Sequence, residues 1–240
     1  MRGFPDPTGA EEATFPMHVL LSGIVGSTAY GLAHAGSDLD RLGLFAAPTE
    51  GFHGLHRPVE SHVTTAPDHT LHEAAKWCRL ALSCNPTAAE LVWLPAELYE
   101  TRTPLGEELI ALRRSFLSAQ PVRNAYLGYA RQQFQKLASR DTTDRTGRAR
   151  AAKHARHLIR LLLQGVTLHE TGELQIRLAD PERVRALGER IADRPELARP
   201  LLADAETRFA RPGVLPQAPD EAPVEDWLRR VRLAHLTPAA

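Results

Sequence analysis

The most constraining feature of this sequence is a short apolar segment that ends at a glycine-serine pair. Residues 18–25 are rich in aliphatic and β-branched side chains, which predicts a buried strand. Gly26-Ser27-Thr28-Ala29-Tyr30-Gly31 follows directly, and a helical turn is expected to begin near Thr28. Free backbone N–H groups at such a turn favour an anion, the Ser27 hydroxyl adds a donor, and Gly26 permits the close approach of a phosphate.

A pair of acidic residues follows this turn. Ser37-Asp38-Leu39-Asp40 leads into a second predicted strand at 42–46. Strand alternation would turn Asp38 and Asp40 to one side and Leu39 into the core. Two carboxylates about 7 Å apart on one strand face repel each other unless a cation lies between them. Mg²⁺ is commonly held by one or two carboxylates plus substrate phosphates, so the two motifs together indicate metal-assisted phosphoryl or nucleotidyl transfer. Each motif alone also occurs in ordinary turns and helix caps.

Two further motifs lie downstream. Asp68-His-Thr-Leu-His-Glu73-Ala-Ala-Lys76 runs on to Asn85-Pro86 and Glu90-Leu91, and Lys153-His154-x-x-His157-Leu-x-Arg160 lies in the second half. Over about residues 18–180 these motifs resemble the nucleotidyltransferase superfamily of DNA polymerase β. The resemblance is closest to the predicted nucleotidyltransferases of the RNA-repair-pathway polymerase β family.

The resemblance implies an α+β fold, with a small mixed sheet and helices followed by a helical C-terminal region. It implies transfer of a nucleoside monophosphate from an NTP such as ATP to a hydroxyl of an RNA end, a protein or a small molecule, with release of pyrophosphate. Two Mg²⁺ or Mn²⁺ ions would bind with the nucleotide, on Asp38, Asp40 and a third acid. Gly26, Ser27 and Tyr30 would bind nucleotide. The alternative is a non-catalytic nucleotide- or RNA-binding regulator, such as an antitoxin-like or defence-associated component.

The third catalytic carboxylate has two candidates, Asp68 and Glu73. The superfamily places this acid on a later strand beside the first pair, which favours Asp68. Alternation puts residues 68, 70 and 72 on one strand face and 69, 71 and 73 on the other, so only one candidate is expected to point at Asp38 and Asp40. Glu73 would otherwise complement a helix dipole at the first turn of a helix.

A basic stripe runs along a long helix predicted from about residue 148 to 171. Arg150, Lys153, His157 and Arg160 recur at helical spacing, and the stretch from Arg145 to Arg160 contains no acid. Either this face is solvated, or Lys153, His157 and Arg160 line the cleft and bind phosphate. The third motif of the resemblance favours the cleft. A zinc site at His154 and His157 is rejected, because no third ligand lies in sequence range.

Changes in periodicity suggest three parts: a flexible tail over 1–16, a nucleotidyltransferase domain over 17–100 and a helical domain over 101–240. Strands are expected at 59–65 and 68–72 and again at 173–178. Helices are expected at about 73–85, 87–94, 105–116, 121–137, 181–191 and 196–210, with a last one around Trp227. Residues 140–147 are expected to form a mobile loop, and the prolines of 212–223 a linker.

Composition excludes few function classes. The chain has 29 basic and 29 acidic residues, so any basic site must be local. Cys78 and Cys84 would lie about 9 Å apart on one helix, too far for a disulfide. Without a signal peptide or a run of about 20 apolar residues, a cytoplasmic chain with no membrane partner is expected. The oligomeric state is not predicted.

Overall fold

The computed structural model describes residues 17–139 and 144–236, so the tail predicted over 1–16 lies outside the described residues. Five strands form one mixed sheet in the order β3-β4-β2-β1-β5. The strands are β1 (His18–Ile24), β2 (Arg41–Ala46), β3 (Ser61–Thr65), β4 (Asp68–Glu73) and β5 (Tyr99–Arg102). β2 and β4 run parallel, and every other neighbouring pair is antiparallel. The α+β class with a mixed sheet, expected from the sequence, is confirmed.

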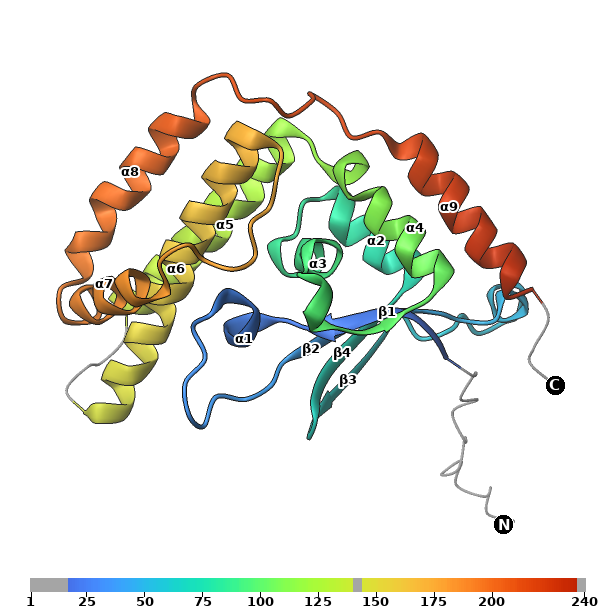
Figure 1. Cartoon of the computed structure of the whole chain (residues 1–240), viewed down its shortest axis with the longest axis horizontal. Helices are drawn as coiled ribbons and strands as arrows, with labels where there is room; N and C mark the ends of the chain where they lie inside the picture. Colours follow the sequence, from blue (N-terminus) through green and yellow to red (C-terminus); the bar gives the residue numbers. More distant parts are fainter. Residues whose placement is uncertain (1–16, 140–143, 237–240) are drawn as a thin grey trace, which may run out of the picture.

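Helices cover one side of this sheet and extend beyond it (Figure 1). The α-helices are α1 (Gly26–Tyr30), α2 (Ala74–Leu82), α3 (Pro86–Glu90), α4 (Pro104–Ala111), α5 (Ala119–Ala138), α6 (Arg145–Thr171), α7 (Pro181–Asp193), α8 (Ala198–Phe209) and α9 (Glu221–Ala234). Short 3₁₀ turns span Thr49–His53, Leu91–Trp93, Ala96–Leu98, Arg113–Phe116 and Pro195–Leu197. α2, α4 and α9 lie over the sheet, whereas α5 to α8 form a group beside it (Figure 1).

The two faces of the sheet differ in how they are covered. Leu42, Leu44 and Ala46 of β2 belong to the main core beneath the helices. Phe45 of the same strand points to the other face, where it joins Leu71 in a small separate cluster. Because paired residues on neighbouring strands share a face, the face of β2 that meets the helices continues through the even-numbered residues of β4. Of the candidate acids, Asp68 of β4 belongs to this face.

The main core runs through the whole described chain. It contains residues of the sheet, of α2 and of the later helices, among them Leu21, Trp77 and Trp227. The Trp227 indole of α9 donates a hydrogen bond of 2.8 Å to the Leu105 carbonyl oxygen at the start of α4. The predicted domain boundary between residues 100 and 101 falls inside β5, which pairs with β1. The sheet and the C-terminal helices therefore share one core, and α9 returns to the side of the first half.

Several predicted elements need correction. β5 was not predicted, and residues 173–178 form no strand, because the Gln164 side-chain amide binds the carbonyl oxygens of Gln175 and Ile176. α6 begins at Arg145 rather than 148, since the Asp144 side chain caps it, so residues 145–147 of the predicted loop are helical. Residues 140–143 of that loop lie outside the described residues. α9 begins at Glu221, which places the end of the predicted proline linker inside a helix.

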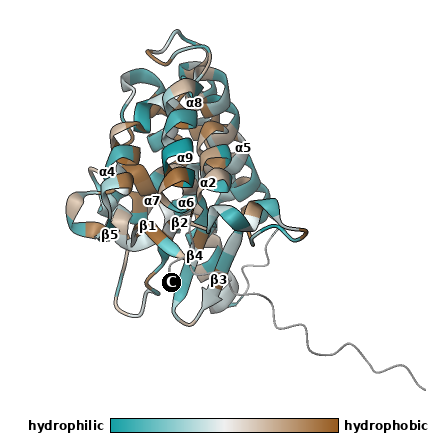
Figure 2. Cartoon of the chain, turned by 90° about the vertical axis from the view of Figure 1, so that its right-hand side faces the viewer, coloured by the Kyte–Doolittle hydropathy of each residue, from teal (hydrophilic) through white to brown (hydrophobic). Residues whose placement is uncertain are grey.

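The helices are two-sided, with hydrophilic and hydrophobic residues alternating along each, as expected where one face packs on a core (Figure 2). None of the described helices is both long enough and apolar enough to cross a membrane.

Candidate active site

The turn after β1 is built around a glycine that accepts no side chain. Gly26 has a φ of 67°, in the left-handed region, and a Cβ placed on it would overlap the Asp40 carboxylate. The backbone N–H of Val25 also donates to the Asp40 carbonyl oxygen at 3.0 Å. Gly26 therefore lets the acidic segment lie directly against the start of α1, so that Ser27 and Asp40 come together.

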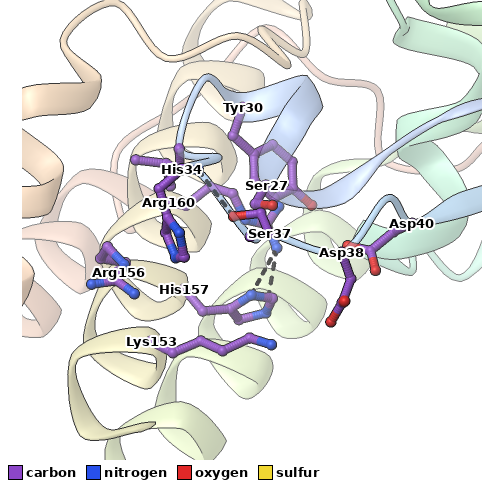
Figure 3. Close-up of a pocket in the computed structure, with 12 residues that line it drawn as sticks. Ser27, Tyr30, His34, Ser37, Asp38, Asp40, Lys153, Arg156, His157 and Arg160 are labelled. Carbon is purple, nitrogen blue, oxygen red and sulfur yellow. Dashed lines mark hydrogen bonds between the residues drawn. The ribbon is translucent and has the colours of Figure 1, made fainter. Parts of the chain in front are cut away.

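A cavity of about 480 Å³ opens at this point, between the sheet and α6 (Figure 3). The side nearest the sheet is formed by α1 and the loop that follows it, and the opposite side by α6. Its lining residues are Ser27, Tyr30, Leu32, His34, Gly36, Ser37, Asp38, Asp40, Lys153, Arg156, His157 and Arg160. Segments more than 110 residues apart thus form one pocket, which contains most of the site residues predicted from the sequence.

The acidic pair lies in a loop, not in a strand. β2 begins only at Arg41, so Asp38-Leu39-Asp40 precedes it, and Leu39 is 37% exposed instead of entering the core. The expected reason for the two acids to share a side was therefore wrong. Both nevertheless line the same cavity, because the loop carries them over the end of the sheet (Figure 3).

Asp68 lies close enough to Asp40 to raise the pKa of its carboxyl group. Burial is the largest cause that raises the pKa of Asp40 above its usual value, followed by the negative charge of Asp68; Asp38 adds to the increase and Lys153 opposes it. The strand register explains the proximity: Arg41 is paired with His69, so the residues that precede them, Asp40 and Asp68, are neighbours. Three carboxylates therefore gather at this end of the sheet.

The structure does not bring Glu73 to this cluster. Its side chain is almost fully buried, on the β4 face opposite to that of Asp68. One carboxylate oxygen accepts a hydrogen bond of 2.8 Å from the Ala75 N–H and caps α2, and the other forms an ion pair of 2.7 Å with Arg232 of α9. Both oxygens of Glu73 are thus engaged in holding the fold together.

The acidic cluster suits a hard divalent cation. Within residues 17–139 and 144–236, no three His, Cys, Asp or Glu side chains are close enough to form a metal site alone. Two carboxylates that line a pocket, with a third nearby, match the protein share of a Mg²⁺ site that is completed by phosphate and water oxygens. Burial first and the charge of Asp68 second raise the pKa of Asp40, and a bound cation would favour its ionised form.

The opposite wall of the pocket is basic. Lys153 is exposed, makes no ion pair with any described carboxylate, and points across the cavity toward Asp38 and Asp40 (Figure 3). Arg156 lines the cavity beside it and is paired at 3.1 Å with Glu189 of α7. The basic stripe is therefore divided. Lys153, His157 and Arg160 line the cleft, while Arg150, one turn earlier, is exposed and lies outside the set of lining residues.

Arg160 and Tyr30 belong to a buried network at the back of the pocket. The Arg160 guanidinium is 1% exposed and forms an ion pair of 2.9 Å with Glu90. It also donates a hydrogen bond of 2.7 Å to the Gln164 amide oxygen and lies 4.2 Å from the centre of the Tyr30 ring. The Tyr30 hydroxyl donates to Glu90 at 2.5 Å. The polar groups of both residues thus bind other parts of the protein, although the sequence predicted that they would bind nucleotide.

His157 is a neutral residue in a cationic environment. Burial is the largest cause that lowers its pKa to about 3, and the positive charges of Arg160, His154, Lys136 and Lys153 add to the effect. Arg160 Nη2 lies 3.4 Å from Nδ1 and 3.3 Å from Nε2 of the imidazole. His157 therefore offers a neutral ring to the pocket at physiological pH.

Sequence reasoning missed several lining residues, chiefly Leu32, His34 and Gly36 of the loop and Arg156 of α6. Only helical spacing could have indicated Arg156, because residues 153, 156 and 160 lie on one face of a helix. The loop residues carry no comparable signal. Their position is fixed locally, since the Ser37 hydroxyl accepts a hydrogen bond of 2.9 Å from the His34 N–H.

Comparison with known proteins places this geometry in context. No curated protein matches the chain. A solved structure described as a nucleotidyltransferase-like protein from Exiguobacterium sibiricum 255-15 is similar at 12% sequence identity and a TM-score of 0.28, covering 93% of this chain and 73% of that one. A TM-score this low assigns no residue. The model of the RNA repair pathway DNA polymerase beta family, however, matches residues 9–206, and the chain therefore belongs to that family.

Proposed function

We propose that this protein is a divalent-metal-dependent nucleotidyltransferase, which moves a nucleoside monophosphate from an NTP to a hydroxyl acceptor. Family membership supports a nucleotidyltransferase role. One observation carries the rest of the proposal: a single cavity has carboxylates on one wall and, on the other, an ammonium group that no carboxylate of the described residues pairs with. A nucleoside triphosphate with bound Mg²⁺ has the complementary arrangement of charge, since its metal binds carboxylates while its phosphate oxygens bind a cation.

In this proposal Asp38 and Asp40 hold the metal, and Asp68 serves as a further ligand or as the base. When bound, Mg²⁺ or Mn²⁺ neutralises triphosphate charge and favours ionisation of the acceptor hydroxyl. The acceptor oxygen forms a bond to the α-phosphorus, the bond from the α-phosphorus to the bridging oxygen breaks, and pyrophosphate leaves with that oxygen. The hydroxyl proton passes to Asp68 or to water. The chain's own contribution is to position the reactants.

The basic wall contributes two different kinds of contact. Lys153 is the cation available to phosphate, together with the Ser27 hydroxyl on the facing wall. Arg160 supports the wall of the pocket and does not contact phosphate itself, because its guanidinium is engaged by Glu90 and Gln164. The neutral ring of His157 suits a hydroxyl or amine of the ribose or base better than a phosphate. These assignments orient the nucleotide, with its triphosphate toward Ser27 and Lys153.

The decisive experiment is pyrophosphate release from ATP, CTP, GTP and UTP with Mg²⁺ or Mn²⁺. Wild type should release pyrophosphate when an acceptor from cell extract is supplied, and Asp38→Asn/Asp40→Asn should not. Asp226→Asn is a matched control, because Asp226 is exposed on α9, outside the cavity lining. Equal activity of wild type and the double variant would refute the catalytic assignment. NTP binding with no pyrophosphate release from any extract would favour the non-catalytic regulator instead.

Labelled NTPs in the same extract would identify the acceptor, whether RNA end, protein or small molecule. We further propose a cytoplasmic location, supported by Cys78 and Cys84, which are both buried and unpaired. Measuring the free thiols of protein taken from cells under acid quench would test this, and two reactive thiols after denaturation are expected.

A further inference from the structure

A second cavity lies further along α6 than the proposed active site, toward the C-terminal end of this helix. Its volume is about 340 Å³, within the range of small-molecule sites, and it is enclosed by α6, residues 175–180, α7 and one residue of α8. These helices lie together at one end of the molecule, away from the sheet (Figure 1). Of the residues that line this cavity, the proposed function involves only Gln164, as a partner of Arg160.

The floor of the cavity is apolar and open to solvent. Ile159, Val184 and Leu187 pack along it, and Leu163 of α6 is 47% exposed. A smaller cavity of about 70 Å³ continues the floor along α6 toward α8 and shares Leu163 and Leu201 with it. The fold thus leaves part of Leu163 in contact with water. An apolar group bound in the cavity would cover this surface and remove it from water.

The rim of the cavity carries two arginines, Arg177 and Arg183, which the described carboxylates pair weakly or not at all. The Arg183 side chain is exposed and makes no ion pair with any described carboxylate. Arg177 has one such partner, Glu97, at 3.8 Å, and both of these side chains are at least 60% exposed, so this pair contributes little. The single acid on the rim, Asp180, accepts a hydrogen bond of 2.9 Å from the Arg183 N–H and caps α7.

We propose that this cavity binds a small amphipathic anion, whose apolar or aromatic body covers Leu163 and whose single carboxylate, sulfonate or phosphate contacts Arg183 and Arg177. The charge pattern selects this occupant over a neutral apolar molecule. An acid on a compact hydrophobic body satisfies both the floor and the rim, and a guanidinium can bind its oxygens in a bidentate manner. The proposal does not depend on nucleotidyl transfer.

The test uses 8-anilinonaphthalene-1-sulfonate, an aromatic body with one sulfonate, and follows its fluorescence with the full chain. Wild type should bind it saturably at one site, and octanoate should displace it at concentrations at which 1-octanol does not. Arg183→Ala should weaken binding about tenfold, and Leu163→Gln should do so to a similar extent. Arg150→Ala is the control, because Arg150 is an exposed cation of α6 outside both cavities, and it should leave binding unchanged.

Unfolding by urea would establish that each variant is folded, so that fluorescence does not report a loosened core. Binding that neither Arg183→Ala nor Leu163→Gln weakens would overturn the proposal, as would equal displacement by octanoate and octanol. A wild-type dimer in solution that Leu163→Gln converts to monomers would also overturn it, since a second copy would then cover the floor.

Discussion

The ion pair of Glu90 and Arg160 and the acidic cluster of the candidate site differ in burial, in the signs of their charges and in their partners. Glu90 and Arg160 are buried and oppositely charged, and besides their ion pair each has a further hydrogen-bond partner, Tyr30 for Glu90 and Gln164 for Arg160. Asp38, Asp40 and Asp68 are like-charged and more exposed, and the cation that acts on Asp40 is Lys153, across a cavity. The first cluster is complete without a ligand, whereas the second would be completed by one. Residue type alone therefore does not distinguish a structural charge from a functional one, but the presence of partners does.

The largest effect is expected from breaking the complete cluster. Arg160→Met leaves the Glu90 carboxylate buried without its cation, which should lower the free energy of unfolding by about 3–5 kcal/mol. Urea unfolding measures this directly. Adding Glu90→Gln should recover part of the loss, because a neutral amide oxygen still accepts the Tyr30 hydroxyl. A double variant as unstable as Arg160→Met would show that packing, rather than charge, is what the pair provides.

The incomplete cluster should respond in the opposite way. Asp40→Asn should reduce the rate of pyrophosphate release about 100-fold or more, roughly 2.7 kcal/mol in the barrier. Its stability should be unchanged or slightly higher, because burial and Asp68 already disfavour the ionised form of Asp40. Activity assays and urea unfolding on the same preparation separate the two effects. A stability loss as large as that of Arg160→Met would remove the distinction between the clusters.

Lowering the pH tests whether the cationic side of the pocket keeps His157 neutral. The folded pKa of His157 is lowered to about 3, below the ordinary value near 6.5, so the unfolded chain binds more protons between these values. Stability should therefore fall as the pH drops through this window, by about 2 kcal/mol between pH 7 and pH 5 from this residue. His157→Asn should show a shallower decrease in urea unfolding at the two pH values. Parallel curves for wild type and variant would mean that His157 is not held neutral.

The smallest effect is expected at Lys153. Lys153→Ala should weaken binding of both NTP and inorganic tripolyphosphate about tenfold, or roughly 1.4 kcal/mol, because it removes a phosphate contact. His157→Asn should weaken NTP binding but leave tripolyphosphate binding unchanged, since a neutral ring contacts the nucleoside. Calorimetric titration of both ligands gives the two constants, with Arg150→Ala as the control. Equal losses for both ligands in His157→Asn would place the ring at the phosphates.

Local patterns predicted much of the fold. The apolar run of β1 and the alternation in β3 are properties of neighbouring residues, and both strands form. β5 was missed because Tyr99–Arg102 offers only four residues, and its place in the sheet depends on pairing with β1. The strand expected at 173–178 has the right alternation but no partner strand, because a glutamine side chain of α6 binds its carbonyl oxygens.

The sequence predicted which residues come together in the pocket, but not which partners they bind. Lys153, His157 and Asp40 could be placed in one cleft because separate motifs pointed to it. The partners of Arg160 could not be predicted, since Glu90 lies 70 residues away and nothing local distinguishes an arginine that binds phosphate from one that binds a buried carboxylate. Glu73 is a similar case, because its partner Arg232 lies on the last helix.

Because Gly26 and Asp40 are in close contact, the residue at one position limits which residues the other can hold. The carboxylate occupies the volume that a methyl group at 26 would need, so an alanine there would require a smaller side chain at 40, besides the backbone strain of an L residue at a φ of 67°. Such a paired exchange would preserve packing but remove one acid from the site. Among relatives, a residue other than glycine at the position of Gly26 should therefore occur together with the loss of the aspartate at the position of Asp40. Such relatives would keep the fold but lack the proposed nucleotidyl transfer.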